Sequence, residues 1–172
     1  MNIFDKGKPK FFKQGTILLK QGDVCNFGCK VLKGCLKSFL IDRSGKEHII
    51  QFAPEGWIIT DMESLLNKTP SNITIEVSED CEVIWLDNST VDIWDKIPRE
   101  ELLVQIGLFT RNIIASNRRV RLLLSSTGKE RYMDFMDTYP TLAKRLPLKL
   151  IASYIGVTPE YLSEIRRKMA GK

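Results

Sequence analysis

Hydrophobic positions change their spacing halfway along this chain. In the first half, short runs rich in β-branched and aromatic residues are separated by turn-forming groups such as Gln21-Gly22-Asp23, Lys33-Gly34 and Pro54-Glu55-Gly56. Short strands at this spacing favour a β-roll or jelly-roll-like domain over residues 1–97. The predicted strands are Thr16–Leu19, Cys29–Leu32, Cys35–Ile41, Glu47–Phe52, Asn72–Val77 and Cys81–Leu86. Short helices are predicted at Asp61–Leu66 and Asn88–Trp94.

One long helix is predicted from Pro98 to about Ser126, because no other proline follows before Pro140. Its first half is apolar on too many sides for one packing partner. A second apolar line, formed by Leu102, Leu108, Phe109 and Ile114, is expected to pack on the preceding domain. We predict a dimerisation helix over residues 98–127, and a long core helix of a monomer is the alternative. The predicted dimer seam has alternating spacings of three and four and consists of Leu103, Ile106, Thr110, Ile113, Asn117, Val120 and Leu124.

The most specific signal lies at the C-terminal end. Thr127-Gly128 is expected to end the long helix and to act as a hinge, and Lys129–Asp137 to form a helix with Tyr132, Phe135 and Met136 inward. A helix is predicted at Leu148–Ile155, ended by Gly156 in the left-handed conformation. Thr158, Pro159 and Glu160 then suit the first turn of another helix. This order of helix, glycine turn and helix describes a helix-turn-helix within residues 128–172.

The second helix of this motif has two faces at about 100° per residue. Leu162, Ile165 and Met169 are expected to face the core, and the opposite face of a helix-turn-helix enters the major groove of DNA. Glu160, Ser163 and Arg167 can reach base edges, while Arg166 and Lys168 suit phosphates. The alternative is a solvated, charged helix at the end of an ordinary bundle. The predicted DNA-binding residues are Thr158, Glu160, Tyr161, Ser163, Glu164, Arg166, Arg167 and Lys168.

Composition adds few constraints. A net charge of +5 allows a nucleic-acid partner without requiring one. No apolar run approaches membrane-spanning length, and the N-terminus lacks the apolar core of a signal peptide, so we expect a cytoplasmic protein with no membrane partner. The four cysteines have no C-x-x-C spacing and are expected to be reduced thiols, with a metal or iron–sulfur site as the alternative. With His48 as its only histidine, the chain lacks the ligands of a cupin-type metalloenzyme, so we predict no enzyme activity and no cofactor.

These features resemble the CRP/FNR family of bacterial transcription regulators along nearly the whole chain. The motifs Glu130-Arg131-Tyr132 and Ile151–Glu160 resemble in particular the short family members common in the Bacteroidetes. The resemblance implies an α+β protein in which a cyclic-nucleotide-binding-type β-roll is joined through a dimerisation helix to a DNA reader. The matching motifs are Gln21-Gly22-Asp23, Val31-Leu32-Lys33-Gly34, Gly45-Lys46-Glu47, Pro54-Glu55-Gly56, Glu130-Arg131-Tyr132 and Ile151–Glu160.

The sequence also departs from the family pattern. Cyclic-AMP-binding members carry a phosphate cassette with Gly-Glu and a later arginine, whereas the equivalent stretch here, Trp57–Glu76, has neither. Cyclic AMP is therefore not expected as the effector, whose identity stays open. The resemblance implies a homodimer, double-stranded DNA and RNA polymerase as partners. The effector pocket that it suggests consists of Asp61, Glu63, Ser64, Ser116 and Asn117. A small-ligand sensor with no DNA-reading role is the alternative function.

Overall fold

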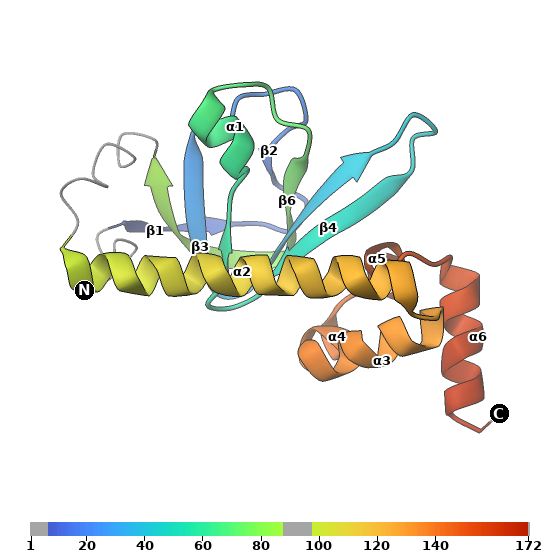
Figure 1. Cartoon of the computed structure of the whole chain (residues 1–172). Coiled ribbons are helices and arrows are strands. Elements are labelled where there is room, and N and C mark those ends of the chain that lie inside the picture. The colour runs from blue at the N-terminus through green and yellow to red at the C-terminus, as the bar shows by residue number, and fades with distance from the viewer. Residues whose placement is uncertain (1–6, 88–97, 172) are drawn as a thin grey trace. The chain divides into compact units, whose positions relative to one another are not determined.

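The computed structural model describes residues 7–87 and 98–171. The chain divides into two compact units (Figure 1). The first contains residues 1–40 and 50–114, and the second contains residues 41–49 and 115–172. The predicted domain limits at residues 97 and 127 remain predictions.

An antiparallel sheet forms most of the first unit. Its described strands are β1 (Lys8–Phe12), β2 (Ile17–Leu19), β3 (Phe27–Ile41), β4 (Glu47–Ala53), β5 (Ile58–Ile59) and β6 (Thr74–Asp87). The strand order is β1-β6-β3-β4, with β2 also paired to β6 and β5 to β3. This arrangement confirms the jelly-roll-like class predicted from the short apolar runs.

The strands differ from the prediction in their ends. The turn predicted at Lys33-Gly34 does not exist, because β3 continues through these residues as a bulged strand. Gly34 has a φ of +89°, and a side chain there would overlap the carbonyl oxygen of Asp80 on β6. The bulge uses turn-forming residues while it keeps the strand pairing. The single strand β6 begins at Thr74 and contains the rest of the predicted run Asn72–Val77 together with Cys81–Leu86, and β1 and β5 were not predicted.

The core of the first unit fills the inside of the sheet. It contains Leu36, Ile75 and Val77, all fully buried, with Phe27 stacked on Trp85 at a centroid distance of 4.0 Å. The predicted helix after Thr60 is present as α1 (Met62–Asn67), and Asp61 is its N-cap residue. The helix predicted at Asn88–Trp94 lies outside the described residues.

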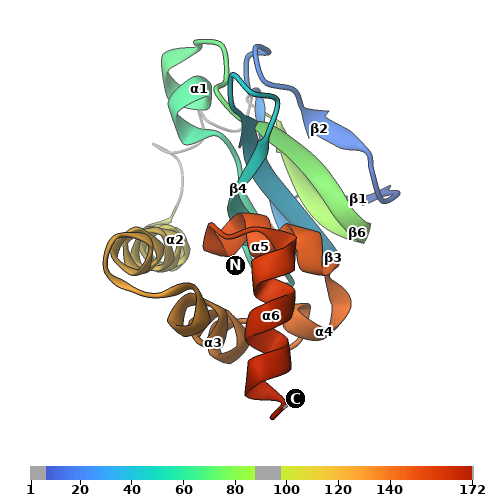
Figure 2. The same cartoon turned by 90° about the vertical axis from the view of Figure 1, so that its right-hand side faces the viewer.

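The helix α2 (Arg99–Ser125) confirms the predicted long helix. In the second unit it is followed by α3 (Gly128–Thr138), α4 (Leu142–Arg145), α5 (Leu148–Ile155) and α6 (Pro159–Met169). Figure 2 shows α3, α4, α5 and α6 gathered around one small core, to which Phe135, Leu142 and Ile151 contribute fully buried side chains.

Gly128 has a role that differs from the predicted C-cap. Thr127 caps the start of α3: its Oγ1 accepts from the N–H of Glu130, and the Glu130 carboxylate accepts from the Thr127 N–H in return. Gly128 is thus the first residue of α3. A Cβ at this position would lie 2.8 Å from Cε1 of Tyr161 and 3.0 Å from Cγ1 of Val157. Glycine is therefore explained at position 128 by the close approach of α6 and the turn before it, and not by a left-handed backbone conformation.

Candidate nucleic-acid interface

The turn between α5 and α6 has the predicted geometry. Gly156 is left-handed, at φ 71° and ψ 42°, and the N–H of Val157 donates to the carbonyl of Ala152 at 3.0 Å. Thr158 Oγ1 then accepts from the N–H of Tyr161 at 3.2 Å, and Pro159 occupies the first turn of α6. The glycine ends one helix and the threonine begins the next, which fixes the angle between them.

Two residues attach α6 to the core of its unit. Leu162 and Ile165 are buried, as predicted. Met169 was predicted to face the core, and this is wrong, because its side chain is 40% exposed. It lies one turn beyond Ile165, the last buried residue of the helix.

The predicted DNA-binding residues lie on the solvent side of α6 and at its start. Thr158, Glu160, Tyr161, Ser163, Arg166, Arg167 and Lys168 are exposed, and Glu164 is half-buried. Glu164 accepts from Lys168 Nζ at 2.7 Å, and this contact lowers the pKa of the Glu164 carboxyl group. Ser163 Oγ donates to the carbonyl of Pro159 at 2.9 Å. Because Lys168 offsets Glu164, the cationic side chains Arg166 and Arg167 dominate the C-terminal half of this surface.

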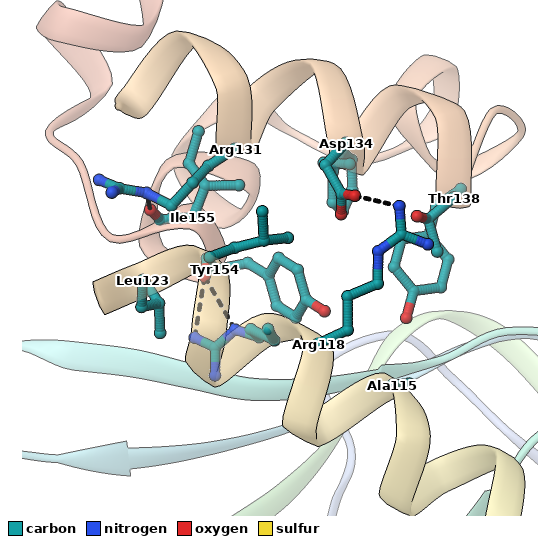
Figure 3. A pocket seen from close by; sticks show the side chains of 12 residues that line it. Ala115, Arg118, Leu123, Arg131, Asp134, Thr138, Tyr154 and Ile155 are labelled. Atoms are coloured by element: carbon teal, nitrogen blue, oxygen red, sulfur yellow. Dashed lines mark hydrogen bonds and ion pairs between the residues drawn. The ribbon is translucent and has the colours of Figure 1, made fainter. Parts of the chain in front are cut away.

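Three arginines connect the helices of the second unit, of which only Arg131 was singled out from the sequence, as part of a family motif. They line a cavity in Figure 3 together with apolar side chains of α2, α3 and α5. Arg118 of α2 forms an ion pair with Asp134 of α3. Arg131 of α3 donates to Ile155 O at the end of α5 at 2.6 Å and to Ser126 O just after α2 at 2.5 Å.

The third arginine, Arg119, bonds to two segments. Its Nη2 donates to the carbonyl of Tyr154 on α5 at 2.8 Å and to the carbonyl of Ile49 at 2.7 Å. Its guanidinium carbon lies 4.5 Å from the centre of the Tyr154 ring. Exposed carbonyls at the ends of helices attract such donors, but the signal is invisible in sequence because partners lie up to 70 residues away.

The predicted dimer seam of α2 faces solvent. Its members Leu103, Ile106, Thr110, Ile113, Asn117, Val120 and Leu124 are exposed, with Leu124 at 83%. The second apolar line was only partly right: Leu102, Leu108 and Phe109 are half-buried, but Ile114 is 61% exposed. The buried side of α2 instead carries the polar residues Glu101 and Gln105.

Two further polar residues attach the first part of α2 to the rest of the first unit. Arg111 donates to the carbonyl of Gly56 at 2.6 Å and Asn112 donates to the carbonyl of Ile58 at 3.1 Å. Contacts made by polar side chains do not appear in the spacing of apolar residues, so the sequence pattern did not indicate them.

The residues suggested for an effector pocket fall into two groups. Asp61 and Ser64 bond to the chain itself: Asp61 accepts from Ser64 N at 3.1 Å and from Ser71 Oγ at 2.6 Å, and Ser64 Oγ accepts from Cys25 N at 2.8 Å. Glu63 is exposed. Ser116 and Asn117 are exposed on the part of α2 that belongs to the second unit. A ligand role for these five residues stays a prediction.

The four cysteines and the single histidine have structural surroundings. All four cysteines are reduced and buried. Burial raises the pKa of the Cys29 thiol and brings that of Cys81 to about 12. In the β3–β4 hairpin, the side chain of Ser44 donates to Asp42 and holds the pKa of its carboxyl group low, and His48, with Nε2 at 2.7 Å from Asp42 Oδ2, adds to this effect. Within residues 7–87 and 98–171, no group of three or more such side chains forms a metal site, and no helix has the length and apolarity to cross a bilayer.

Comparison with known proteins agrees with this architecture. Residues 9–92 match the family described as cyclic nucleotide-binding domain. The anaerobic regulatory proteins of Pasteurella multocida and Haemophilus influenzae are 26% and 27% identical to the chain over 95% of its length. The chain spans 63% and 66% of these two relatives.

Solved structures show the same fold. FixK2 from Bradyrhizobium japonicum aligns over 96% of this chain and 85% of its own, with a TM-score of 0.79 and 15% identity. A CRP/FNR-family transcriptional regulator from Thermus thermophilus aligns over 95% of this chain and 86% of its own, with a TM-score of 0.73 and 17% identity. Residues 9–92 therefore match a cyclic nucleotide-binding domain, and the chain shares the fold of CRP/FNR-family transcriptional regulators.

Proposed function

We propose that this protein is a sequence-specific DNA-binding transcription regulator that acts as a homodimer and has no enzyme activity. The observation that carries the proposal is the helix-turn-helix formed by α5, Gly156 and α6, with the predicted reading residues of α6 on its solvent side. The relatives named as anaerobic regulatory proteins and the CRP/FNR-family transcriptional regulator of the same fold support the same function. RNA polymerase is the expected partner on DNA.

The homodimer is supported by the solvent face of α2. A helix of 27 residues is about 40 Å long and presents leucine, isoleucine and valine to solvent with heptad spacing. An exposed apolar stripe of this length requires a cover, and a second copy of the same helix matches it in length and period. In such a dimer, the paired α2 helices would hold the two copies of α6 so that they enter successive major grooves of a pseudo-palindromic site.

We propose further that the β-roll has lost the cyclic-nucleotide phosphate cassette. In this chain, the Asp61 carboxylate occupies the start of α1, where it accepts from the Ser64 amide and the Ser71 hydroxyl. A carboxylate at this position would repel a cyclic phosphate, and the stretch Trp57–Glu76 holds no arginine to offset it. In equilibrium dialysis we expect cyclic AMP and cyclic GMP to show dissociation constants above about 1 mM, which means negligible specific binding.

The test is selection of duplexes from a random pool by the purified protein. We expect an enriched inverted repeat whose half-sites lie about 10 to 11 base pairs apart. Replacing Arg167 by alanine should weaken binding to the selected duplex and lower the slope of log affinity against log salt by about one. The matched control is Arg43→Ala, which removes an exposed arginine of the β3–β4 hairpin.

Absence of any enriched repeat, with an unchanged salt slope for Arg167→Ala, would contradict the DNA-reading function. The alternative, a small-ligand sensor without its own reading role, would then be the better description.

A further inference from the structure

The first helix of the helix-turn-helix is held from two sides in the second unit. On one side lies α2, whose Arg119 donates from Nη2 and Nε to the carbonyl of Tyr154, at 2.8 and 3.1 Å. This carbonyl is in the last turn of α5, where the helix itself offers no donor. The planar fork of the guanidinium and its stacking on the Tyr154 ring restrict the orientation of the contact.

On the other side lies the hairpin segment Ile41–Ile49. The Oγ of Ser153, one residue before Tyr154, donates to the carbonyl of Glu47 at 2.9 Å and accepts from the N–H of Ile49 at 3.1 Å. Arg119 joins the same hairpin strand through the carbonyl of Ile49 at 2.7 Å. Two side chains, Arg119 and Ser153, thus connect α2, α5 and the hairpin through five hydrogen bonds.

These contacts determine how α6 is presented relative to α2. Leu162 and Ile165 pack α6 on the core that also contains Ile151 and Ala152 of α5, so the two helices move together. If α2 lies at the dimer axis, the placement of α5 on α2 sets the separation of the two reading helices.

We propose that Arg119 and Ser153 are positioning residues that determine which half-site spacing the dimer accepts. The proposal rests on the proposed DNA-reading function. The two side chains touch no DNA themselves, and the base preference within each half-site belongs to α6. Loss of the Arg119 contacts loosens α5 on α2, and loss of the Ser153 contacts loosens α5 on the hairpin that Arg119 joins to α2. Either change lets the dimer accept wrongly spaced sites.

The experiment uses the full-length protein and the duplex selected above. Dissociation constants are measured for this duplex, for versions with one or two base pairs added or removed between the half-sites, and for a single half-site. Wild type is expected to prefer the selected spacing by about tenfold or more over a shift of two base pairs, a typical discrimination for a rigid dimer. The variants are Arg119→Lys, which keeps the charge and loses the fork, and Ser153→Ala.

Both variants should reduce the spacing preference to about threefold or less, with single half-site binding within about twofold of wild type. The controls are Arg43→Lys on the exposed hairpin turn and Ser125→Ala near the end of α2, which should keep the wild-type preference. A thermal unfolding curve for each protein identifies variants that do not fold, and the conclusion rests on those that do.

A wild-type spacing preference in a folded Arg119→Lys or Ser153→Ala protein would overturn the proposal. Equal loss of single half-site binding and of spacing preference would also overturn it, since it would show a general role in folding. Failure of the wild-type protein to enrich any inverted repeat is a different outcome and contradicts the proposed function itself.

Discussion

Two glycines of this chain are required for different physical reasons. Gly34 in the β3 bulge and Gly45 in the hairpin turn share a positive φ, at +89° and +82°. A Cβ at Gly34 would overlap the backbone of Asp80, whereas a Cβ at Gly45 would meet nothing within 4 Å. The pair therefore separates the effect of backbone conformation from that of crowding.

We expect Gly45→Ala to lower the free energy of unfolding by about 1 to 2 kcal/mol, the strain of a left-handed alanine. Gly34→Ala should lower it by about 2 kcal/mol more, because the strand must move away from β6. Urea unfolding followed by circular dichroism measures both. Equal losses would show that the bulge adapts to a side chain.

The cysteines are expected to be inert in the folded protein. Thiol reagents attack the thiolate, and burial both raises the pKa of Cys29 and Cys81 and blocks access to all four sulfurs. Titration with Ellman's reagent at neutral pH should label none of the four thiols quickly in the native state and all four in denaturant. Fast labelling of a native thiol would instead indicate a redox-sensing site.

The capping box at the start of α3 makes the stability of this helix depend on pH. The pKa of Glu130 is lowered because its carboxylate accepts from the N–H and the hydroxyl of Thr127. A lowered pKa means that this carboxylate stabilises the folded state above its usual titration range. The stabilisation is lost as the pH falls through the lowered pKa.

We therefore expect Glu130→Gln to reduce the free energy of unfolding at neutral pH and to make it less dependent on pH between about pH 6 and pH 2. Urea unfolding at several pH values gives the measurement. Asp137→Asn removes an exposed carboxylate from the last turn of the same helix and serves as the control. An unchanged pH profile for Glu130→Gln would contradict the role of the capping box.

The elements also show where sequence patterns were sufficient. The limits of α2, α5 and α6 were predictable because Pro98, Gly156 and Thr158 act through local backbone geometry. The length of β3 was not, because Gly34 looks the same in a turn and in a bulge until β6 is beside it. The arginine contacts of the second unit join residues far apart in the chain, and no local pattern encodes them.

At the scale of the whole molecule, a substitution in the proposed dimer seam of α2 tests whether the protein forms a homodimer. Asn117, like Thr110, is a polar residue within a mostly apolar stripe, and such residues fix the register of paired helices at a cost in stability. Asn117→Leu is expected to tighten the dimer and to allow other registers or oligomers. Sedimentation equilibrium measures the association. Ser116→Leu adds the same side chain on another face of α2 and should leave the association unchanged, and an unaltered dimer in Asn117→Leu would count against the seam.

Three described elements continue from one unit into the other: β3 after Leu40, β4 after Ile49, and α2, which crosses between Ile114 and Ala115 without a break. A residue inserted within α2 at that point would turn the part of the helix beyond it by about 100° and advance it by about 1.5 Å relative to the part before it. An insertion of seven residues would nearly restore the angular phase. A chimaera that places another sensing domain before this reader should therefore work in a periodic set of linker lengths, with helical phase as the variable that evolution or engineering must preserve.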